Sequence, residues 1–305
     1  MKLIDQSYEI IDRDSMTPAQ LIELCGRTCY KSEDKITADS ADKFVQMVVK
    51  RGHLSVLEHA TLALSIPDRV VSQFFEDYRG LLSHMNLSGE TTHEGATIIS
   101  GNLRAWMELL VAGGFLATGY NQIENIIMAY CPPAHDAFFK NEIREPVIKN
   151  IKPISINEIP EEERPLHEYK TVRFITNRGV THELVRHRPA SYSQESTRYC
   201  NYGGKEMEFI RPVWWEESTK FGRNIFNIAC EDSEHDYKQA LKVGWRPEQA
   251  REILPNALKT EIVVTANLKE WAHILKLRTS KAAHPQIRAL MEPLRDELFG
   301  GKNEL

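Results

Sequence analysis

The sequence predicts an α+β protein and argues against a Rossmann dinucleotide fold. Helix start signals are clear, as at Thr17-Pro18-Ala19-Gln20, where Thr17 would be the N-cap and Gln20 would close a capping box. Twice a short β-branched stretch runs directly into an amphipathic one, at 61–66 then 68–78 and at 170–176 then 178–187. No Gly-x-Gly-x-x-Gly follows a predicted strand, so a bound dinucleotide would need other groups to hold it.

Composition and charge narrow the class of protein. The chain has 305 residues, enough for one large domain or two small ones, and 42% of them are hydrophobic. The net charge of -5 argues against a general nucleic-acid binder, because that affinity depends on neutralising phosphates. We expect no membrane span and no signal peptide, since no apolar run is long enough. Five cysteines without framework spacing fit a reducing cytoplasm.

Two helices are expected near the N-terminus. The first runs from the Thr17 cap to about Tyr30, and the second covers about 38–51 and is ended by Gly52. Cys25 and Cys29 lie four apart on one face of the first helix. A metal would need more ligands nearby, so we expect buried thiols.

The stretch 52–59 is polar enough to be a site. It contains His53, Ser55, Glu58 and His59, which make an incomplete metal-ligand set because no third partner of matching spacing is close. A capped loop between a helix and a strand is the alternative.

The cations of the chain concentrate in 182–199. Arg186, His187, Arg188 and Arg198 lie there among serine and threonine hydroxyls. Pro189 disfavours helix at the preceding residue, so a helix arriving from Asn177 should stop near His187 or Arg188. The cations could simply favour the negative end of the helix dipole. A phosphate site explains the hydroxyls as well, because arginine forks and hydroxyls are the donors that phosphate requires.

Part of the chain resembles another part. Residues 57–79 can be laid over 166–188, and 100–106 over 265–271, with Asn-Leu-basic-x-Trp in both members of the second pair. Duplication is one explanation, and shared composition of amphipathic helices is the other. Of the two similar segments, only 166–188 ends in Arg-His-Arg. Residues 151–168 are rich in proline and glutamate and are predicted to be an exposed connector.

The C-terminal third should be mostly helical. We expect a long helix at 225–243 ended by Gly244, a short one from Pro247, and a last one at 285–298. A strand is predicted at 259–265, and Asn267 should open a helix that ends at Arg278.

Arg-His-Arg, seven residues and Ser, met by Arg186 to Arg188 and Ser196, resembles the motif of the flavin-dependent thymidylate synthases. The family's His-x-Ser/Thr-x-x-Glu-His stretch resembles 53–59. The resemblance covers 20–59 and 169–298. It implies a twisted, mainly antiparallel sheet flanked by helices in one catalytic domain, 1–305, with an insertion at about 60–168.

The resemblance also implies an activity: reductive methylation of dUMP to dTMP. Methylenetetrahydrofolate supplies the carbon and NADPH-reduced FAD the hydride, in a homotetramer with shared active sites, without nucleic acid or membrane partners. Arg278 would be catalytic, because a cation at the pyrimidine edge stabilises charge on the ring. The implied FAD contacts are His53, Ser55, Arg186, His187, Arg188, Asn267 and His273. The implied dUMP contacts are Glu183, Arg186, Gln194, Ser196, Arg198, Arg251 and Arg278.

Three residues depart from the family pattern. Glu183 stands where Gln is common, Lys269 where Arg is common, and His273 where Asn is common. Glu183 would repel a phosphate unless Arg186 neutralises it. The alternatives are an RNA- or nucleotide-binding protein that uses Arg186, Arg188 and Tyr192, and a flavin- and folate-dependent uracil methylase acting on RNA. Neither a cysteine nucleophile nor a metal is expected.

Overall fold

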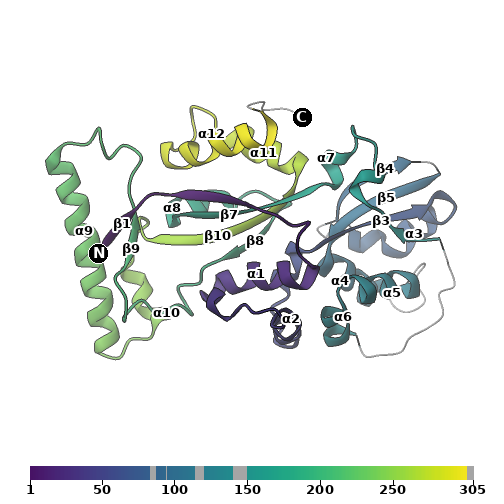
Figure 1. Cartoon of the computed structure of the whole chain (residues 1–305), viewed down its shortest axis with the longest axis horizontal. Coiled ribbons are helices and arrows are strands. Elements are labelled where there is room, and N and C mark those ends of the chain that lie inside the picture. The colour runs from purple at the N-terminus through teal and green to yellow at the C-terminus, as the bar shows by residue number, and fades with distance from the viewer. Residues whose placement is uncertain (83–86, 94, 114–119, 140–149, 301–305) are drawn as a thin grey trace.

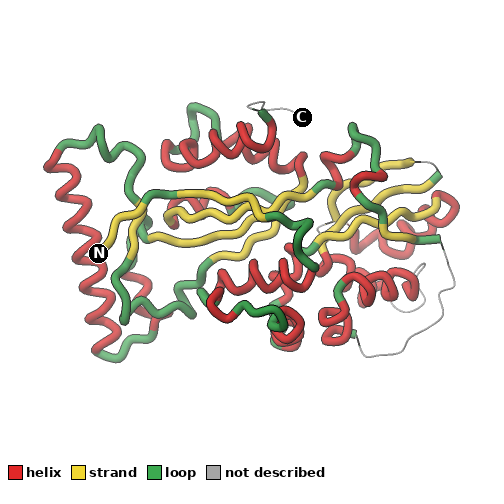
Figure 2. Tube along the Cα trace, in the orientation of Figure 1, coloured by secondary structure: helices red, strands yellow, loops and turns green. Residues whose placement is uncertain are grey.

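The computed structural model describes residues 1–82, 87–93, 95–113, 120–139 and 150–300. Its strands form two four-stranded antiparallel sheets and one parallel pair, and helices flank the sheets (Figures 1 and 2). The predicted α+β class with a mainly antiparallel sheet is confirmed.

The first sheet has the strand order β2-β7-β10-β8. Its strands are β2 (Ser7–Ile11), β7 (Tyr169–Asn177), β10 (Lys259–Asn267) and β8 (Ser191–Gln194). Along β10, Ile262 and Val264 pack into a core with Trp271, whereas Val263 packs on the opposite face with Cys25. This alternation follows from the two-residue period of a strand, and it places helices on both faces of the sheet.

Helices cover both faces of this sheet (Figure 1). One face carries α8 (Arg178–Leu184), α11 (Leu268–Arg278) and α12 (Pro285–Phe299), and the other carries α1 (Pro18–Tyr30). The capping box predicted for α1 is confirmed, because the Thr17 hydroxyl accepts from Gln20 N while the Gln20 side chain accepts from Thr17 N. The helix from the Asn267 cap to Arg278 also has its predicted bounds.

The second sheet has the order β4-β5-β3-β6. Its strands are β3 (Thr61–Pro67), β4 (Leu87–His93), β5 (Ala96–Asn102) and β6 (Lys152–Pro153). Its helices are α3 (Asp68–Leu82), α4 (Leu103–Gly113), α5 (Tyr120–Tyr130) and α6 (Pro132–Phe138), and α2 (Ala41–Lys50) shares their core. The pair Gly113-Gly114 predicts the end of α4, and Gly114 lies outside the described residues.

The two sheets use the same hydrogen bonds at the start of their second helix. In the second sheet, the Trp106 indole donates to Leu62 O at 3.1 Å, and in the first the Trp271 indole donates to Lys170 O at 3.1 Å. Both tryptophans are fully buried.

The preceding asparagines also match. Asn102 Oδ1 accepts from Ala105 N, and Asn267 Oδ1 accepts from Glu270 N, each at 2.8 Å. Asn-Leu-basic-x-Trp is thus a local structure as well as a sequence pattern, in which the asparagine caps the helix and the tryptophan fixes it to the neighbouring strand.

The remaining elements frame these sheets. β1 (Lys2–Ile4) pairs in parallel with β9 (Glu208–Ile210), beside the long helix α9 (Lys220–Lys242) at the left of Figure 1. The short helices are α7 (Arg164–His167) and α10 (Pro247–Ala250), and the 3-10 turns are Glu33–Lys35, Leu54–His59, Ile156–Glu158 and Arg251–Ile253. Within the described residues, no helix has the length and apolar character needed to cross a membrane.

Two expectations were wrong. α8 ends at Leu184, three residues before His187, because the chain tightens there into turns in which Arg186 N donates to Glu183 O and His187 N to Leu184 O. The stretch 151–168 is not simply an exposed connector, since Ile151 and Ile159 are buried. Its prolines and charged residues correctly predicted an irregular backbone, but they did not predict that some of its apolar side chains would be buried.

Candidate active site

A cavity of about 680 Å³ lies between the Arg-His-Arg segment and α11. Five of the predicted FAD residues line it together with Arg278, and Glu183 contacts Arg278 from α8. The lining residues are Leu166, Arg186, His187, Arg188, Pro189, Asn267, Lys269, Glu270, His273, Leu277 and Arg278.

Arg278 connects α11 to the motif through its whole guanidinium group. Nη1 donates to the Glu183 carboxylate at 2.7 Å, Nη2 to the Glu183 carbonyl at 2.9 Å, and Nε to His187 Nε2 at 2.9 Å. A planar guanidinium holds its three acceptors in fixed directions, whereas the three donors of a lysine ammonium rotate freely. The candidate catalytic arginine is therefore fixed in position by two residues of the preceding motif.

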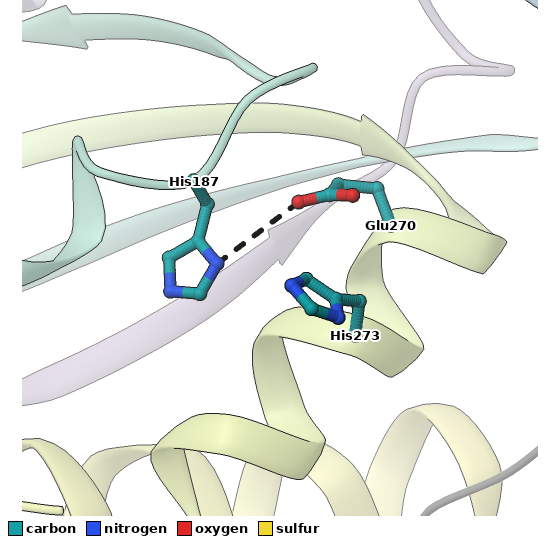
Figure 3. Close-up of side chains that lie close together, drawn as sticks. All are labelled: His187, Glu270 and His273. Carbon is teal, nitrogen blue, oxygen red and sulfur yellow. Dashed lines mark ion pairs between the residues drawn. The ribbon is translucent and has the colours of Figure 1, made fainter.

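These contacts determine the protonation of His187. Because arginine can only donate, His187 Nε2 must accept, and the ring proton belongs on Nδ1. Burial, and then the charges of Arg278 and His273, lower the pKa of His187 to about 4. The imidazole is accordingly neutral near pH 7, and its N–H faces the carboxylate of Glu270 (Figure 3).

Glu270 was not among the predicted site residues. Its Oε1 lies 4.0 Å from His187 Nδ1, is buried, and has no hydrogen-bond partner among the described residues. Burial raises the pKa of this carboxyl group, against the opposing charge of His273. Its spacing from Asn267, Asn-x-x-Glu, resembles a capping box, a pattern that gives no sign of a place in a cavity.

His187, Glu270 and His273 offer ligand atoms within 4.8 Å of one another, as a metal site would. The arginine argues against that use. With Nε2 of His187 accepting from Arg278, Nδ1 carries the proton and has no lone pair to offer a metal. The trio is suited to hydrogen bonding with an organic ligand.

The loop that carries Arg186 to Arg188 is held in place by a tyrosine of the neighbouring strand β8. The Tyr192 hydroxyl donates to the carbonyl oxygens of Leu184 and His187, at 2.8 and 2.9 Å. Asn267 is held as well, since Nδ2 donates to Leu166 O at 2.9 Å while Oδ1 caps α11. Both walls of the cavity are therefore positioned by hydrogen bonds to backbone.

A second group of predicted residues lies elsewhere, near the C-terminal end of α1. Arg198 donates to the Tyr199 hydroxyl at 2.7 Å, Tyr199 packs against Tyr30, and the Tyr30 hydroxyl bonds His53 Nδ1 at 2.7 Å. Ser196 N donates to Cys29 O, which ties this group to α1. Arg198 and His53 are exposed.

The other predicted residues belong neither to the cavity nor to the group near the end of α1. Gln194 donates to Thr181 and Thr260 hydroxyls, Arg251 bonds its neighbour Glu252, and Ser55 is exposed. The structure thus gathers the predicted FAD residues of the motif and of α11, and it leaves most predicted dUMP residues outside that cavity.

The charge of Glu183 is neutralised, but by a different arginine from the one that the sequence suggested. Arg278 is its partner, and Arg186 is exposed with a 3.4 Å bond to the His182 carbonyl. The side chain of Arg186 leaves the short helix at its C-terminal end, where the neighbouring carbonyl is the nearest acceptor.

A protein-family model described as "Thymidylate synthase complementing protein" matches residues 10–100 and 166–299, which is more than half of the chain. The chain belongs to this family. The match passes over 101–165, which overlaps the predicted insertion.

Curated relatives match over shorter stretches. The flavin-dependent thymidylate synthase of Geobacter sulfurreducens is 39% identical over 114 residues, which are 37% of this chain and 49% of that protein. The enzyme of the same name from Pyrococcus abyssi is 39% identical over 127 residues, 40% of this chain and 50% of that protein. The chain spans about half the length of the curated relatives it matches.

Two solved structures are similar at a lower level. Thymidylate synthase X from Helicobacter pylori, with FAD and dUMP, has a TM-score of 0.36 and 24% identity over 44% of this chain and 68% of that one. The UMP/dUMP methylase PolB from Streptomyces cacaoi, bound with 5-Br dUMP, has a TM-score of 0.41 and 15% identity over 98% of this chain and 93% of that one.

Proposed function

We propose that this protein is a flavin-dependent thymidylate synthase, which methylates dUMP to dTMP with methylenetetrahydrofolate as carbon donor and NADPH as reductant. The observation that carries the proposal is the fixing of Arg278 by Glu183 and His187 beside one cavity. Membership in the family and the names of the curated relatives support it.

The cavity fits FAD in size and in donor set. Its volume of about 680 Å³ is within the ordinary range for cofactor sites. Arg186, Arg188 and Lys269 supply exposed cations for a pyrophosphate, and the buried Glu270 oxygen needs a donor that a ligand hydroxyl or imide could provide. When bound, reduced FAD supplies the hydride that completes the methyl group.

Arg278 would stabilise negative charge that develops on the uracil ring. Glu183 and His187 hold its guanidinium in one orientation, so little reorganisation is needed during the reaction. In this role Glu183 is a positioning residue, and its contact with Arg278 answers the objection that its charge would repel the substrate phosphate. Ser196 and Arg198 remain our candidates for that phosphate.

We propose that a homotetramer completes the site. Ser196, Arg198 and His53 lie at the α1 end and line no wall of the cavity in their own chain, so another chain would bring them to it. α9 offers a surface for such contacts, because Phe221, Ile225 and Ile228 are 74%, 53% and 48% exposed on one helical stripe.

We also propose that residues 1–305 form one catalytic domain in which 60–168 repeats part of the core without repeating the flavin site. The matching hydrogen bonds of Trp106 and Trp271 support the repeat. The lack of Arg-His-Arg in 57–79 supports the absence of a second flavin site. All five cysteines are free thiols, which supports a cytoplasmic location.

The test is tritium release from C5 of labelled dUMP with FAD, NADPH and methylenetetrahydrofolate. Wild-type protein should turn over, and Arg278→Ala should be about a hundredfold to a thousandfold slower. Arg295→Gln is the matched control, because that arginine pairs with Asp296 on α12 and should leave the rate unchanged. Parallel assays with UMP and with uracil-containing RNA identify the substrate, and turnover of RNA alone would refute thymidylate synthesis.

A further inference from the structure

A second cavity, of about 730 Å³, lies where the two sheets meet. Its lining residues come from the end of β2, the starts of β3 and β7, and the start of α1. Its apolar wall includes Leu62, Ile154, Ile156 and Ile159. No residue of the candidate active site lines it.

Arg13 lines this cavity without an acidic partner. Nη1 donates to His59 O at 3.1 Å and to the Thr171 hydroxyl at 2.7 Å, and Nη2 donates to the Thr61 hydroxyl at 2.7 Å. These bonds use three of the five N–H donors of a guanidinium, so two remain. Among the described residues, no carboxylate lies within ion-pair distance of Arg13, and the acidic charge that acts on it from farther away is that of the exposed Asp14. Arg13 is half-buried, so a counter-charge would stabilise it, and burial lowers its pKa.

Tyr169 supplies an independent sign of a missing ligand. It lines the same cavity, and its buried hydroxyl has no hydrogen-bond partner among the described residues. Burial raises the pKa of this hydroxyl, and the charge of Arg13 opposes the shift, so the two groups are neighbours. An orphaned buried hydroxyl is uncommon in folded proteins.

The acidic groups around the cavity are occupied or exposed. Glu168 pairs with Lys170 at 2.8 Å, and Glu297 accepts from the Tyr8 hydroxyl at 2.8 Å. The remaining two, Asp12 and Asp14, are exposed at the rim. The unpaired positive charge therefore lies inside, next to apolar surface.

We propose that this cavity binds an amphipathic carboxylate, whose carboxylate accepts from Arg13 and Tyr169 and whose hydrocarbon part packs on Leu62, Ile154, Ile156 and Ile159. A single charge suits the single unpaired guanidinium, whereas a phosphate dianion would need further cations. The apolar wall requires a hydrocarbon body of several carbons.

The probe is octanoate, added to the full-length chain and followed by calorimetry, with octan-1-ol as the uncharged control. Wild-type protein should bind octanoate at least about tenfold more tightly than octanol, because a charge-assisted pair is lost with the alcohol. Arg13→Gln should weaken octanoate by about tenfold to a hundredfold. Ile156→Trp should fill the cavity and abolish binding, while Ile36→Trp, at an exposed position 40% accessible, should not.

Tyr169→Phe is the decisive variant, because it should move two measurements in opposite directions. Removing an orphaned hydroxyl should leave Tm unchanged or raised, and removing a ligand donor should weaken octanoate about threefold to tenfold. If Arg13→Gln fails to fold, Tyr169→Phe and Ile156→Trp still test whether octanoate binds in this cavity. Unchanged octanoate affinity in Tyr169→Phe and Ile156→Trp, equal binding of octanol, or no binding by wild type would overturn the proposal.

Discussion

The contact between Arg278 and Glu183 should be a strong energetic coupling, and a double-mutant cycle can measure it. The four proteins are wild type, Arg278→Gln, Glu183→Gln and the double variant. Glutamine keeps most of the side-chain volume and removes the charge, so each change deletes the ion pair with little loss of packing. Urea unfolding gives the free energy of each protein, and the coupling is the departure from additivity.

The structure sets the expected magnitude. The side chains of Arg278 and Glu183 are 20% and 33% exposed, and their atoms lie 2.7 Å apart. Exposed ion pairs contribute roughly 0.2–1 kcal/mol, while hydrogen bonds to charged groups contribute about 1.5–3 kcal/mol. For a half-buried pair we expect a coupling of about 1–2 kcal/mol, reduced at high salt.

The pair Arg246–Glu248 is the control. Its atoms are 2.8 Å apart, but its side chains are 72% and 42% exposed, so its coupling should be below about 0.5 kcal/mol. A coupling for Arg278–Glu183 no larger than the control would refute the idea that Glu183 positions the arginine. In the coupled case, Glu183→Gln should lower kcat for dUMP more than it changes KM.

Three further predictions concern the same cavity and its surroundings. Stability should fall between about pH 6.5 and pH 4, by up to about 3 kcal/mol from His187, because the unfolded imidazole takes up a proton that the folded one, with a pKa of about 4, does not. His187→Gln should lose that part of the pH dependence in urea titrations, and an unchanged profile would contradict the assignment. Cys200→Ala should keep most dUMP turnover without a protein adduct by mass spectrometry, because burial raises the pKa of this thiol to about 11. Absorbance should show one FAD per chain, and two would contradict a single site.

Local signals predicted the elements that matter most. The cap at Thr17, Pro18 at the first helical position and the Asn267 cap act within a few residues, so the sequence shows their partners directly. For the same reason α11 was predicted from Asn267 to Arg278 with its observed bounds. The motif at Arg186 to Arg188 was also visible, because its residue types are chemically unusual together.

The contacts between distant segments could not be predicted in this way. Arg278 meets Glu183 across 95 residues of sequence, and Arg13 meets Thr171 across 158. Which partner an arginine takes depends on how strands and helices pack, and the sequence offered the nearer Arg186 as the partner of Glu183. Glu270 was missed because its place in the cavity depends on how α11 packs against the Arg-His-Arg segment, which no local pattern shows.

The two sheets show how a fold can be repeated while its chemistry is not. The asparagine cap and the tryptophan bond are made to backbone groups, and both recur at the two places where Asn-Leu-basic-x-Trp follows a strand of this chain. The contacts of the candidate active site are made by other side chains of the helix, which this pattern does not specify. Counting from the asparagine in each unit, Ala105 stands in place of Glu270, and Gly113 in place of Arg278. An alanine and a glycine can form neither the carboxylate contact nor the guanidinium fork, which is why we propose that the unit at 60–168 extends the core without holding a flavin.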